Sequence, residues 1–281
     1  MSRPAPEGPL VSTAWLAERL GEPGLKVVDA TWFMPGQGDA AAAHRAGRIP
    51  GAVRVDIDQI ADRASPLPHM LPAPEAFAAA AGALGLGDED LIVAYGLAAP
   101  RVWWMVRAMG HDAVAVLDGG LAKWAAEGRP IETGEPPAPA PARFTARFRP
   151  ELVRGFSEVA AALDSGLPVL DARPGDRFRG EAPEPRPGLA SGHMPGALSL
   201  PSASLFAADG TFRSAEALEA LVRSAGHDPA RPAIATCGSG VTACMIALAL
   251  ARLGAWHTAV YDGSWTEWGG RADAPVATGP G

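Results

Sequence analysis

The chain is poor in cysteine, with only Cys237 and Cys244 among its 281 residues. Two cysteines are too few for a disulfide framework, and cysteine-based zinc sites need further ligands at close spacing. On one helix, residues seven positions apart would be separated by roughly 10 Å, which is beyond the reach of a disulfide. Both thiols are therefore expected to be free, as is usual in a reducing compartment.

The chain also lacks long apolar runs and blocks of basic residues. No apolar stretch approaches the ~20 residues that span a bilayer, and residues 1–12 lack the charged segment and apolar run of a signal peptide. The net charge is −7, and no basic block resembles the footprint of a nucleic-acid-binding protein. We therefore expect a soluble, cytoplasmic protein with neither a membrane nor a nucleic acid as a partner.

What the chain does contain is an internal repeat, in which three blocks recur in the same order at offsets of 142 to 145 residues. The paired blocks are Val28-Asp29-Ala30 with Leu170-Asp171-Ala172, Gly47-Arg48-Ile49-Pro50-Gly51-Ala52 with Gly192-His193-Met194-Pro195-Gly196-Ala197, and Asp118-Gly119-Gly120 (then Trp124) with Asp262-Gly263-Ser264 (then Trp268). Between the copies, residues 135–142 are Pro and Ala apart from one Glu, which favours an extended connector. We predict two copies of one domain, over residues 1–134 and 150–281, with a linker over residues 135–149.

Each copy alternates short apolar runs with helical stretches. The runs expected to form buried parallel strands are residues 25–28, 91–95 and 113–117 in the first copy, and residues 167–170, 233–236 and 258–261 in the second. Helices are expected over residues 102–109 and 241–253. This alternation predicts an α/β protein, with an open, mainly parallel sheet flanked by helices on both faces in each copy.

Cys237 lies where such sheets carry their sites, just beyond the carboxyl end of a predicted strand. It opens the stretch Cys237-Gly238-Ser239-Gly240-Val241-Thr242, between strand 233–236 and the predicted helix. Backbone N–H groups and the positive end of the helix dipole would converge on the thiol there. Gly238 and Gly240 are expected to permit a tight curl with positive φ. The pattern predicts a nucleophilic thiol, whereas Cys244 lies among apolar residues and is predicted to be core.

The first copy lacks this thiol. Counted from the strands, Gly96 falls where Cys237 would be. The interval from Gly96 to Gly110 is 14 residues, against 17 from Cys237 to Gly254. The first copy is therefore interpreted as a degenerate partner, and the chemistry is assigned to the second.

These motifs resemble the two-domain rhodanese superfamily, and more closely its 3-mercaptopyruvate sulfurtransferase branch. Residues 192–197 are similar to the superfamily's Gly-His-Ile-Pro-Gly-Ala signature, and the Asp-Gly turns with their following Trp to its C-terminal signature. Thiosulfate-preferring members carry Arg and Lys directly after the cysteine, where this chain has Gly238 and Ser239. Losing two cations weakens the binding of a dianion, and the Ser239 hydroxyl offers a hydrogen bond to a singly charged keto acid. The resemblance therefore implies 3-mercaptopyruvate as the sulfur donor.

Two further segments resemble the same branch. Residues 177–186 are similar to its Arg-Phe-Arg-Gly…Pro-Glu-Pro-Arg segment, which implies that Arg177 and Arg186 bind the donor's carboxylate and keto oxygen through their guanidinium forks. Residues 55–72 are similar to a segment in which Asp58 and His69 would form a proton relay with the loop Ser239. The residues implied to line the donor-binding loop are Gly238, Gly240, Val241 and Thr242.

The implied reaction passes sulfur through a persulfide on Cys237 to cyanide, a thiol or a thioredoxin-like protein. It releases pyruvate and needs neither a metal nor an organic cofactor. Three alternatives stay open: a thiosulfate sulfurtransferase with the same fold and nucleophile, a cysteine phosphatase and a non-enzymatic regulatory module. A phosphatase would need a phosphate-binding Arg six residues after the cysteine, where this chain has Ala243.

Overall fold

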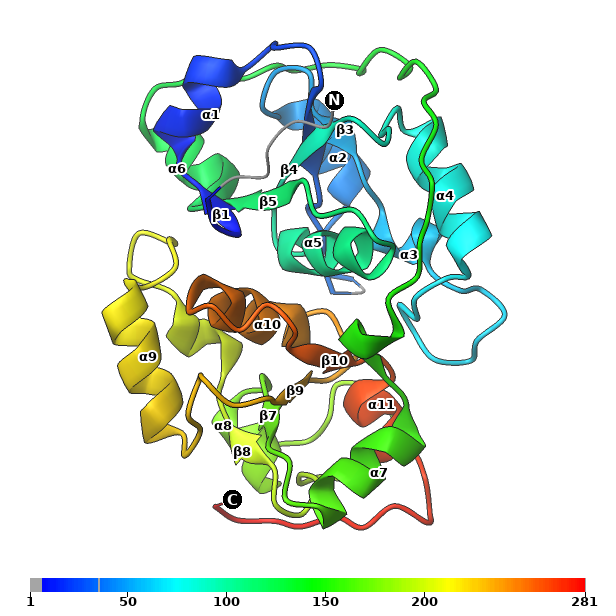
Figure 1. The fold of residues 1–281 in the computed structure, drawn as a ribbon, viewed down its shortest axis with the longest axis vertical. Coiled ribbons are helices and arrows are strands. Elements are labelled where there is room, and N and C mark those ends of the chain that lie inside the picture. The colour runs from blue at the N-terminus through cyan, green and yellow to red at the C-terminus, as the bar shows by residue number, and fades with distance from the viewer. Residues whose placement is uncertain (1–6, 35, 281) are drawn as a thin grey trace. The chain divides into compact units, whose positions relative to one another are not determined.

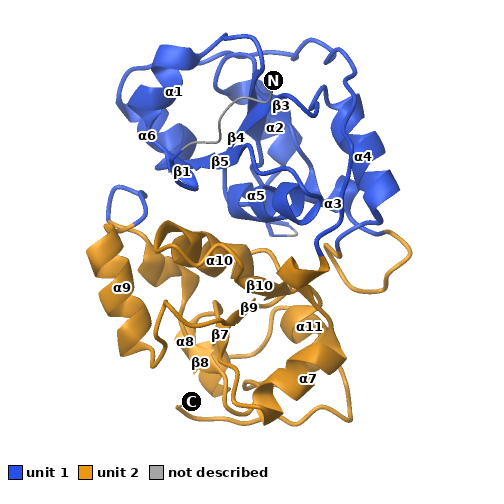
Figure 2. Ribbon diagram, in the orientation of Figure 1, with its two compact units in different colours: residues 1–62, 71–149, 208–212 blue, residues 63–70, 150–207, 213–281 orange. Residues whose placement is uncertain are grey.

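The computed structural model describes residues 7–34 and 36–280, so half of the segment on which the signal-peptide expectation rests, residues 1–6, lies outside the described residues. The chain divides into two compact units (Figure 2). Unit 1 comprises residues 1–62, 71–149 and 208–212, and unit 2 comprises residues 63–70, 150–207 and 213–281. Residues 63–70 and residues 208–212 are therefore grouped with a different unit from the residues on either side of them in the sequence. The limits 1–134 and 150–281 stay predictions of the sequence.

Unit 1 contains a parallel five-stranded sheet in the order β1-β5-β4-β2-β3 (Figure 1). Its strands are β1 (Leu10–Val11), β2 (Leu25–Asp29), β3 (Val53–Arg54), β4 (Leu91–Tyr95) and β5 (Val114–Leu117). Its helices are α1 (Thr13–Arg19), α2 (Ala40–Ala46), α3 (Ile57–Ile60), α4 (Pro74–Ala83), α5 (Ala99–Ala108) and α6 (Gly120–Ala126). The longest strands, β2 and β4, lie beside each other, as apolar runs buried on both faces predict.

Unit 2 repeats this topology with the strand order β6-β10-β9-β7-β8, again all parallel. Its strands are β6 (Val153–Arg154), β7 (Val169–Asp171), β8 (Leu198–Ser199), β9 (Ile234–Thr236) and β10 (Ala259–Tyr261). Its helices are η1 (Pro150–Leu152), α7 (Phe156–Asp164), α8 (Gly175–Arg179), η2 (Ser202–Leu205), α9 (Ala215–Ser224), α10 (Ala243–Arg252) and α11 (Ser264–Trp268). The predicted α/β fold with two copies of one sheet is confirmed.

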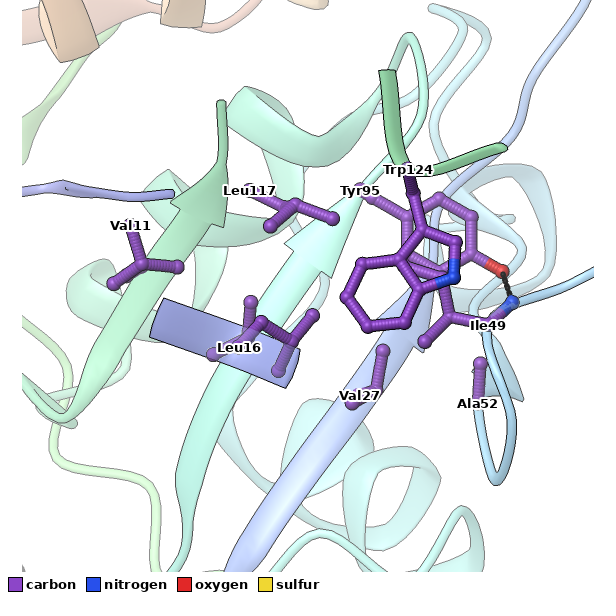
Figure 3. Close-up of a cluster of buried hydrophobic side chains, with 10 residues drawn as sticks. Val11, Leu16, Val27, Ile49, Ala52, Tyr95, Leu117 and Trp124 are labelled. Atoms are coloured by element: carbon purple, nitrogen blue, oxygen red, sulfur yellow. Dashed lines mark hydrogen bonds between the residues drawn. The ribbon is translucent and has the colours of Figure 1, made fainter. Parts of the chain in front are cut away.

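The core of unit 1 lies between the sheet and the pair α1 and α6 (Figure 3). Trp124 of α6 is fully buried among side chains from the strands and from α1, including Leu16 and Val27. Helix α5 packs on strands β4 and β5. In unit 2, α7 and α11 contribute to the equivalent core, and α10 packs on β9 and β10. The apolar runs of the strands thus supply both faces of each sheet.

The repeated blocks have matching structural roles in the two units. The indole of Trp124 donates to the carbonyl of Pro130, and that of Trp268 donates to the carbonyl of Pro275, each at 2.8 Å. The two Gly-x-x-Pro-Gly-Ala blocks each close a turn in which the alanine N–H donates to the carbonyl three residues earlier. These signatures therefore specify the fold of each unit rather than its chemistry.

The Pro- and Ala-rich segment after α6 contains neither a helix nor a strand over residues 135–149. It runs along unit 1, where Ala142, Arg147 and Arg149 donate backbone hydrogen bonds to Gly82, Met109 and Ala108. Thr145 adds a backbone and a hydroxyl hydrogen bond to the carboxylate of Asp88. Among the described residues, no helix is long and apolar enough to cross a membrane.

Candidate active site

Cys237 directly follows β9 and is buried, with 2% of its surface exposed. The sequence predicted that a helix begins at residue 241, but α10 begins at Ala243. Residues 237–242 instead form a loop, in which Gly240 adopts a φ of 75° that a helix cannot contain. Cys237 and Cys244 are therefore not on one helix, although both are free thiols as expected.

Helix α11 fixes the start of this loop. The backbone N–H of Trp265 donates to the carbonyl of Cys237 at 2.9 Å. The N–H and the hydroxyl of Thr266 donate to the carbonyl of Gly238 at 2.9 and 2.6 Å. Both carbonyl groups next to the thiol are therefore hydrogen-bonded, which holds the loop backbone in one conformation.

Several N–H groups of the loop have no protein acceptor. Within the described part of the chain, the backbone N–H groups of Ser239, Val241 and Thr242 donate to no protein atom. Buried backbone N–H groups are seldom left unpaired, and a run of them beside a helix N-terminus is typical of an anion-binding site. The loop can therefore accept negative charge next to Cys237.

Ser264 is a site residue that the sequence analysis did not single out. It is fully buried with a φ of 50°, a strained value for a residue with a Cβ. Its hydroxyl accepts from the N–H of Cys237 at 3.2 Å and donates to the carbonyl of Tyr261 at 2.8 Å. The first unit has Gly120 with a φ of 55° at this position. The change from Asp-Gly-Gly to Asp-Gly-Ser between the copies was the signal that could have revealed it.

The two loop glycines differ in why they are needed. Gly240 has positive φ as expected, but Gly238 does not, so the expectation is wrong for Gly238. A Cβ on Gly238 would lie 3.2 Å from Nη2 of Arg177. Gly238 therefore allows the Arg177 guanidinium to lie directly against the loop, next to the candidate nucleophile.

Arg177 is held there by a buried network of charges. Glu184, whose side chain is 2% exposed, accepts from Nε of Arg177 at 3.3 Å and also from its Nη2. The same carboxylate accepts from Nη1 of Arg173 at 2.8 Å. Arg173 in turn pairs with Asp171 at the end of β7 and lies over the Trp265 ring, 4.1 Å from its centroid. Burial alone would lower the pKa of Arg173, but Asp171 and Glu184 raise it above its ordinary value.

The structure places His69 with Arg186. Residues 63–70 belong to unit 2, and Nε2 of His69 lies 3.4 Å from Nη2 of Arg186. His69 is nearly buried, with 8% of its surface exposed, and has a φ of 61°. Asp58 lies in unit 1, where its carboxylate accepts from the indole of Trp32 at 3.0 Å. Two of the predicted site residues are thus brought together within unit 2.

Cys244 has a structural role, as predicted, and His193 has one as well. The fully buried thiol of Cys244 donates to the carbonyl of Gly240 at 3.2 Å, which links α10 to the loop. Nδ1 of His193 is 2.8 Å from the carbonyl of Phe178, and its ring stacks on Phe178. Across residues 7–34 and 36–280, no group of three or more His, Cys, Asp or Glu residues could hold a metal ion.

The first unit has no room for a thiol at the matching position. Asp29 pairs with Tyr95 as Asp171 pairs with Thr236, so Gly96 corresponds to Cys237. Gly96 has a φ of 101°, and a Cβ on it would lie 2.6 Å from the backbone nitrogen of Thr31. The backbone after β2 occupies the space that a side chain would need.

We expect Gly96→Ala to destabilise unit 1 by about 2–5 kcal/mol, from about 1–2 kcal/mol for the left-handed backbone and about 1–3 kcal/mol for the collision. Gly128→Ala is the matched control, because Gly128 also has positive φ but a Cβ added there would meet no atom within 4 Å. That control should lose only about 1–2 kcal/mol. Urea unfolding of the full chain measures both, and equal losses would show that the collision is relieved at no cost.

This geometry defines a class of protein. It has two α/β units in tandem and a buried cysteine at the end of a parallel strand in the second unit. The family model of the rhodanese-like domain matches residues 12–127 and again residues 156–271. The chain belongs to this family.

Relatives match nearly the whole chain. The 3-mercaptopyruvate sulfurtransferase of Homo sapiens is 44% identical over 276 residues, covering 94% of this chain and 92% of that protein. The thiosulfate sulfurtransferase of Bos taurus is 42% identical over 275 residues, with the same coverage of both. The crystal structure of SseA from Escherichia coli, described as a 3-mercaptopyruvate sulfotransferase, has a TM-score of 0.83 and 38% identity, covering 92% of this chain and 99% of that one.

Proposed function

We propose that this chain is a sulfurtransferase that takes sulfur from 3-mercaptopyruvate, with Cys237 as nucleophile. The observation that carries the proposal is the loop 237–242, where a buried thiol lies among backbone N–H groups without a protein acceptor. Such a loop suits a sulfur anion, because the N–H dipoles stabilise negative charge without a metal or a basic side chain. Both relatives are named sulfurtransferases, and the one from Homo sapiens is named for 3-mercaptopyruvate.

The reaction has two steps. The Cys237 thiolate attacks the sulfur of the donor, an S–S bond forms and the C–S bond breaks. The electrons of the broken bond go to the carbon, and the resulting pyruvate enolate takes up a proton to leave as pyruvate. The persulfide on Cys237 then gives its outer sulfur to an acceptor, which regenerates the thiolate. We propose cyanide, a small thiol or a thioredoxin-like protein as acceptors.

Arg177 and Arg186 are proposed to hold the oxygens of the donor. The Nε and Nη2 edge of Arg177 already donates to Glu184, so this guanidinium offers the donor its other edge, formed by Nη1 and Nη2. Arg177 lies against Gly238, next to the thiol, where it would place a carboxylate close to the reacting sulfur. Gly240, Val241 and Thr242 complete the proposed binding loop.

Proton transfer is proposed to involve His69 and Ser239. Ser239 is buried with 7% of its surface exposed, and an imidazole that exchanges a proton with its hydroxyl would supply the proton that the enolate needs. Nε2 of His69 lies 3.4 Å from Nη2 of Arg186, so the imidazole is next to one of the groups proposed to hold the donor. The part of Asp58 in this relay remains a prediction of the sequence.

The choice of donor does not follow from overall similarity, since relatives of nearly equal identity carry both names. It depends instead on Gly238 and Ser239, neither of which adds a cation to the loop after the thiol. A thiosulfate dianion binds less strongly to such a loop than to one with two cations. The binding of a keto acid monoanion is weakened much less, because it carries only one negative charge.

We therefore expect kcat/KM for 3-mercaptopyruvate to exceed that for thiosulfate by at least about tenfold, or about 1.4 kcal/mol, with cyanide as acceptor. Pyruvate and thiocyanate release measure the two reactions on the same purified protein. Better use of thiosulfate would favour the alternative donor, and the absence of a persulfide with either donor would favour a regulatory module. The phosphatase alternative is disfavoured, because position 243 is a buried alanine instead of an arginine.

A further inference from the structure

We propose that Glu184 contributes to the donor specificity of the site, by balancing the charge of Arg177 so that this guanidinium gives a dianion no advantage over a monoanion. This inference rests on the proposed function, since it explains the preference for a singly charged donor. Neither the loop sequence nor the fold signature assigns a role to Glu184.

The first observation is the geometry of the carboxylate. Glu184 lies in the loop after α8, and its side chain is 2% exposed. One of its oxygens accepts from Nη1 of Arg173 at 2.8 Å and from Nε of Arg177 at 3.3 Å, while the other accepts from Nη2 of Arg177. The carboxylate is therefore hydrogen-bonded to both guanidinium groups at once, and hydrogen bonds between charged partners are the strong ones.

The second observation is the charge balance of the buried cluster. Asp171 and Arg173 form one oppositely charged pair, in which both side chains are 1% exposed. Glu184 and Arg177 form the other, with exposed fractions of 2% and 21%. The cluster as a whole therefore carries no net charge, although it contains two guanidinium groups. Asp176 and the pair Arg179–Glu181 are on the exposed part of this segment, where solvent screens them.

The third observation is where the neutralised guanidinium lies. Nη2 of Arg177 is the atom that a Cβ on Gly238 would meet, so this group lies against the residue that follows Cys237. A donor at Cys237 thus meets hydrogen-bond donors of Arg177 whose positive charge is already balanced by Glu184. Hydrogen bonding to an oxygen is retained, but the extra Coulomb attraction for a second negative charge is lost.

The central test compares wild-type protein with Glu184→Gln, which removes one negative charge and keeps the shape of the side chain. We expect the ratio of kcat/KM for thiosulfate to that for 3-mercaptopyruvate to rise by about tenfold, because Arg177 then carries an unbalanced charge. Wild-type preference is measured first. If wild type uses thiosulfate better, the proposed function fails; if wild type prefers 3-mercaptopyruvate and the ratio in Glu184→Gln is unchanged, only this inference fails.

Two matched variants separate charge from geometry. Glu184→Asp keeps the charge but shortens the reach to Arg177, so we expect slower turnover of both donors with an unchanged ratio. Glu181→Gln removes a carboxylate three residues away that pairs with Arg179 at the surface, and we expect neither the rates nor the ratio to change. A ratio that shifts equally in Glu181→Gln would mean that net charge in general, and not Glu184, is responsible.

A measurement on the wild-type protein keeps the inference testable should Glu184→Gln not fold. Sulfate and methanesulfonate are both tetrahedral sulfur oxyanions but differ by one charge. We expect the two anions, as competitive inhibitors against 3-mercaptopyruvate, to have inhibition constants within about threefold of each other. Sulfate inhibiting more than about tenfold better would show that the site attracts dianions and would overturn the proposal.

Discussion

Replacing Cys237 with serine is expected to abolish sulfur transfer, with kcat reduced by about a thousandfold or more. A serine hydroxyl fits the buried position but is far less acidic than a thiol and cannot form a persulfide. After incubation with 3-mercaptopyruvate alone, mass spectrometry should find one added sulfur atom on wild-type protein and none on Cys237→Ser. Pyruvate release in the presence of cyanide measures the activity.

Cys244→Ser is the matched control, because Cys244 is the only other thiol of the chain. It should keep the persulfide on Cys237, and its hydroxyl can still donate to the carbonyl of Gly240. Activity that survives in Cys237→Ser, or an added sulfur that disappears with Cys244 instead, would contradict the assignment of the nucleophile.

Restoring two cations to the loop is expected to reverse the donor preference. Gly238→Arg combined with Ser239→Lys should raise the ratio of kcat/KM for thiosulfate to that for 3-mercaptopyruvate by about a hundredfold. Each added cation would attract the second negative charge of the dianion by about 1.4 kcal/mol, which raises this ratio about tenfold. A side chain at position 238 meets no backbone atom, because the φ of Gly238 is not positive and the one atom close to the added Cβ is Nη2 of Arg177, which would have to shift by a few tenths of an ångström.

The control for this exchange places the same charges elsewhere in unit 2. Ala220→Arg with Ser224→Lys adds two cations to exposed positions of α9, where solvent screens them. Steady-state kinetics with both donors should show no change in the ratio for this protein. If the control shifts the ratio as much as the loop exchange, the preference reflects the total charge of the protein.

The fold was predictable because the apolar runs that form its strands are short, continuous and repeated. Strands β4 and β5 coincide with their predicted runs to within one residue, since a strand buried on both faces must be apolar throughout. The start of α10 was not predictable from apolar periodicity, because Val241 is buried in the loop and reads like a helical residue. Gly240, with its positive φ, delays the helix by two residues.

The site was predictable only in part. Cys237 could be identified from its position after a strand, but the roles of Ser264 and Glu184 depend on contacts across the fold. Ser264 reaches Cys237 over a separation of 27 residues, and Glu184 joins two arginines that the sequence does not pair. The grouping of residues 63–70 with unit 2 also has no local cause in the sequence. Periodicity and composition describe neighbours along the chain, whereas these contacts are set by how the whole chain folds.

The space beside Gly96 limits what can be built into unit 1. The backbone after β2 occupies the position of the missing side chain, so a cysteine cannot be placed there by one substitution, because its Cβ would collide with Ala30 and Thr31. The loop that follows is also three residues shorter than its counterpart in unit 2. Regaining a nucleophile in unit 1 would require an insertion and a backbone shift together with the cysteine. A second active site therefore cannot be engineered into this chain by placing a cysteine at position 96 alone.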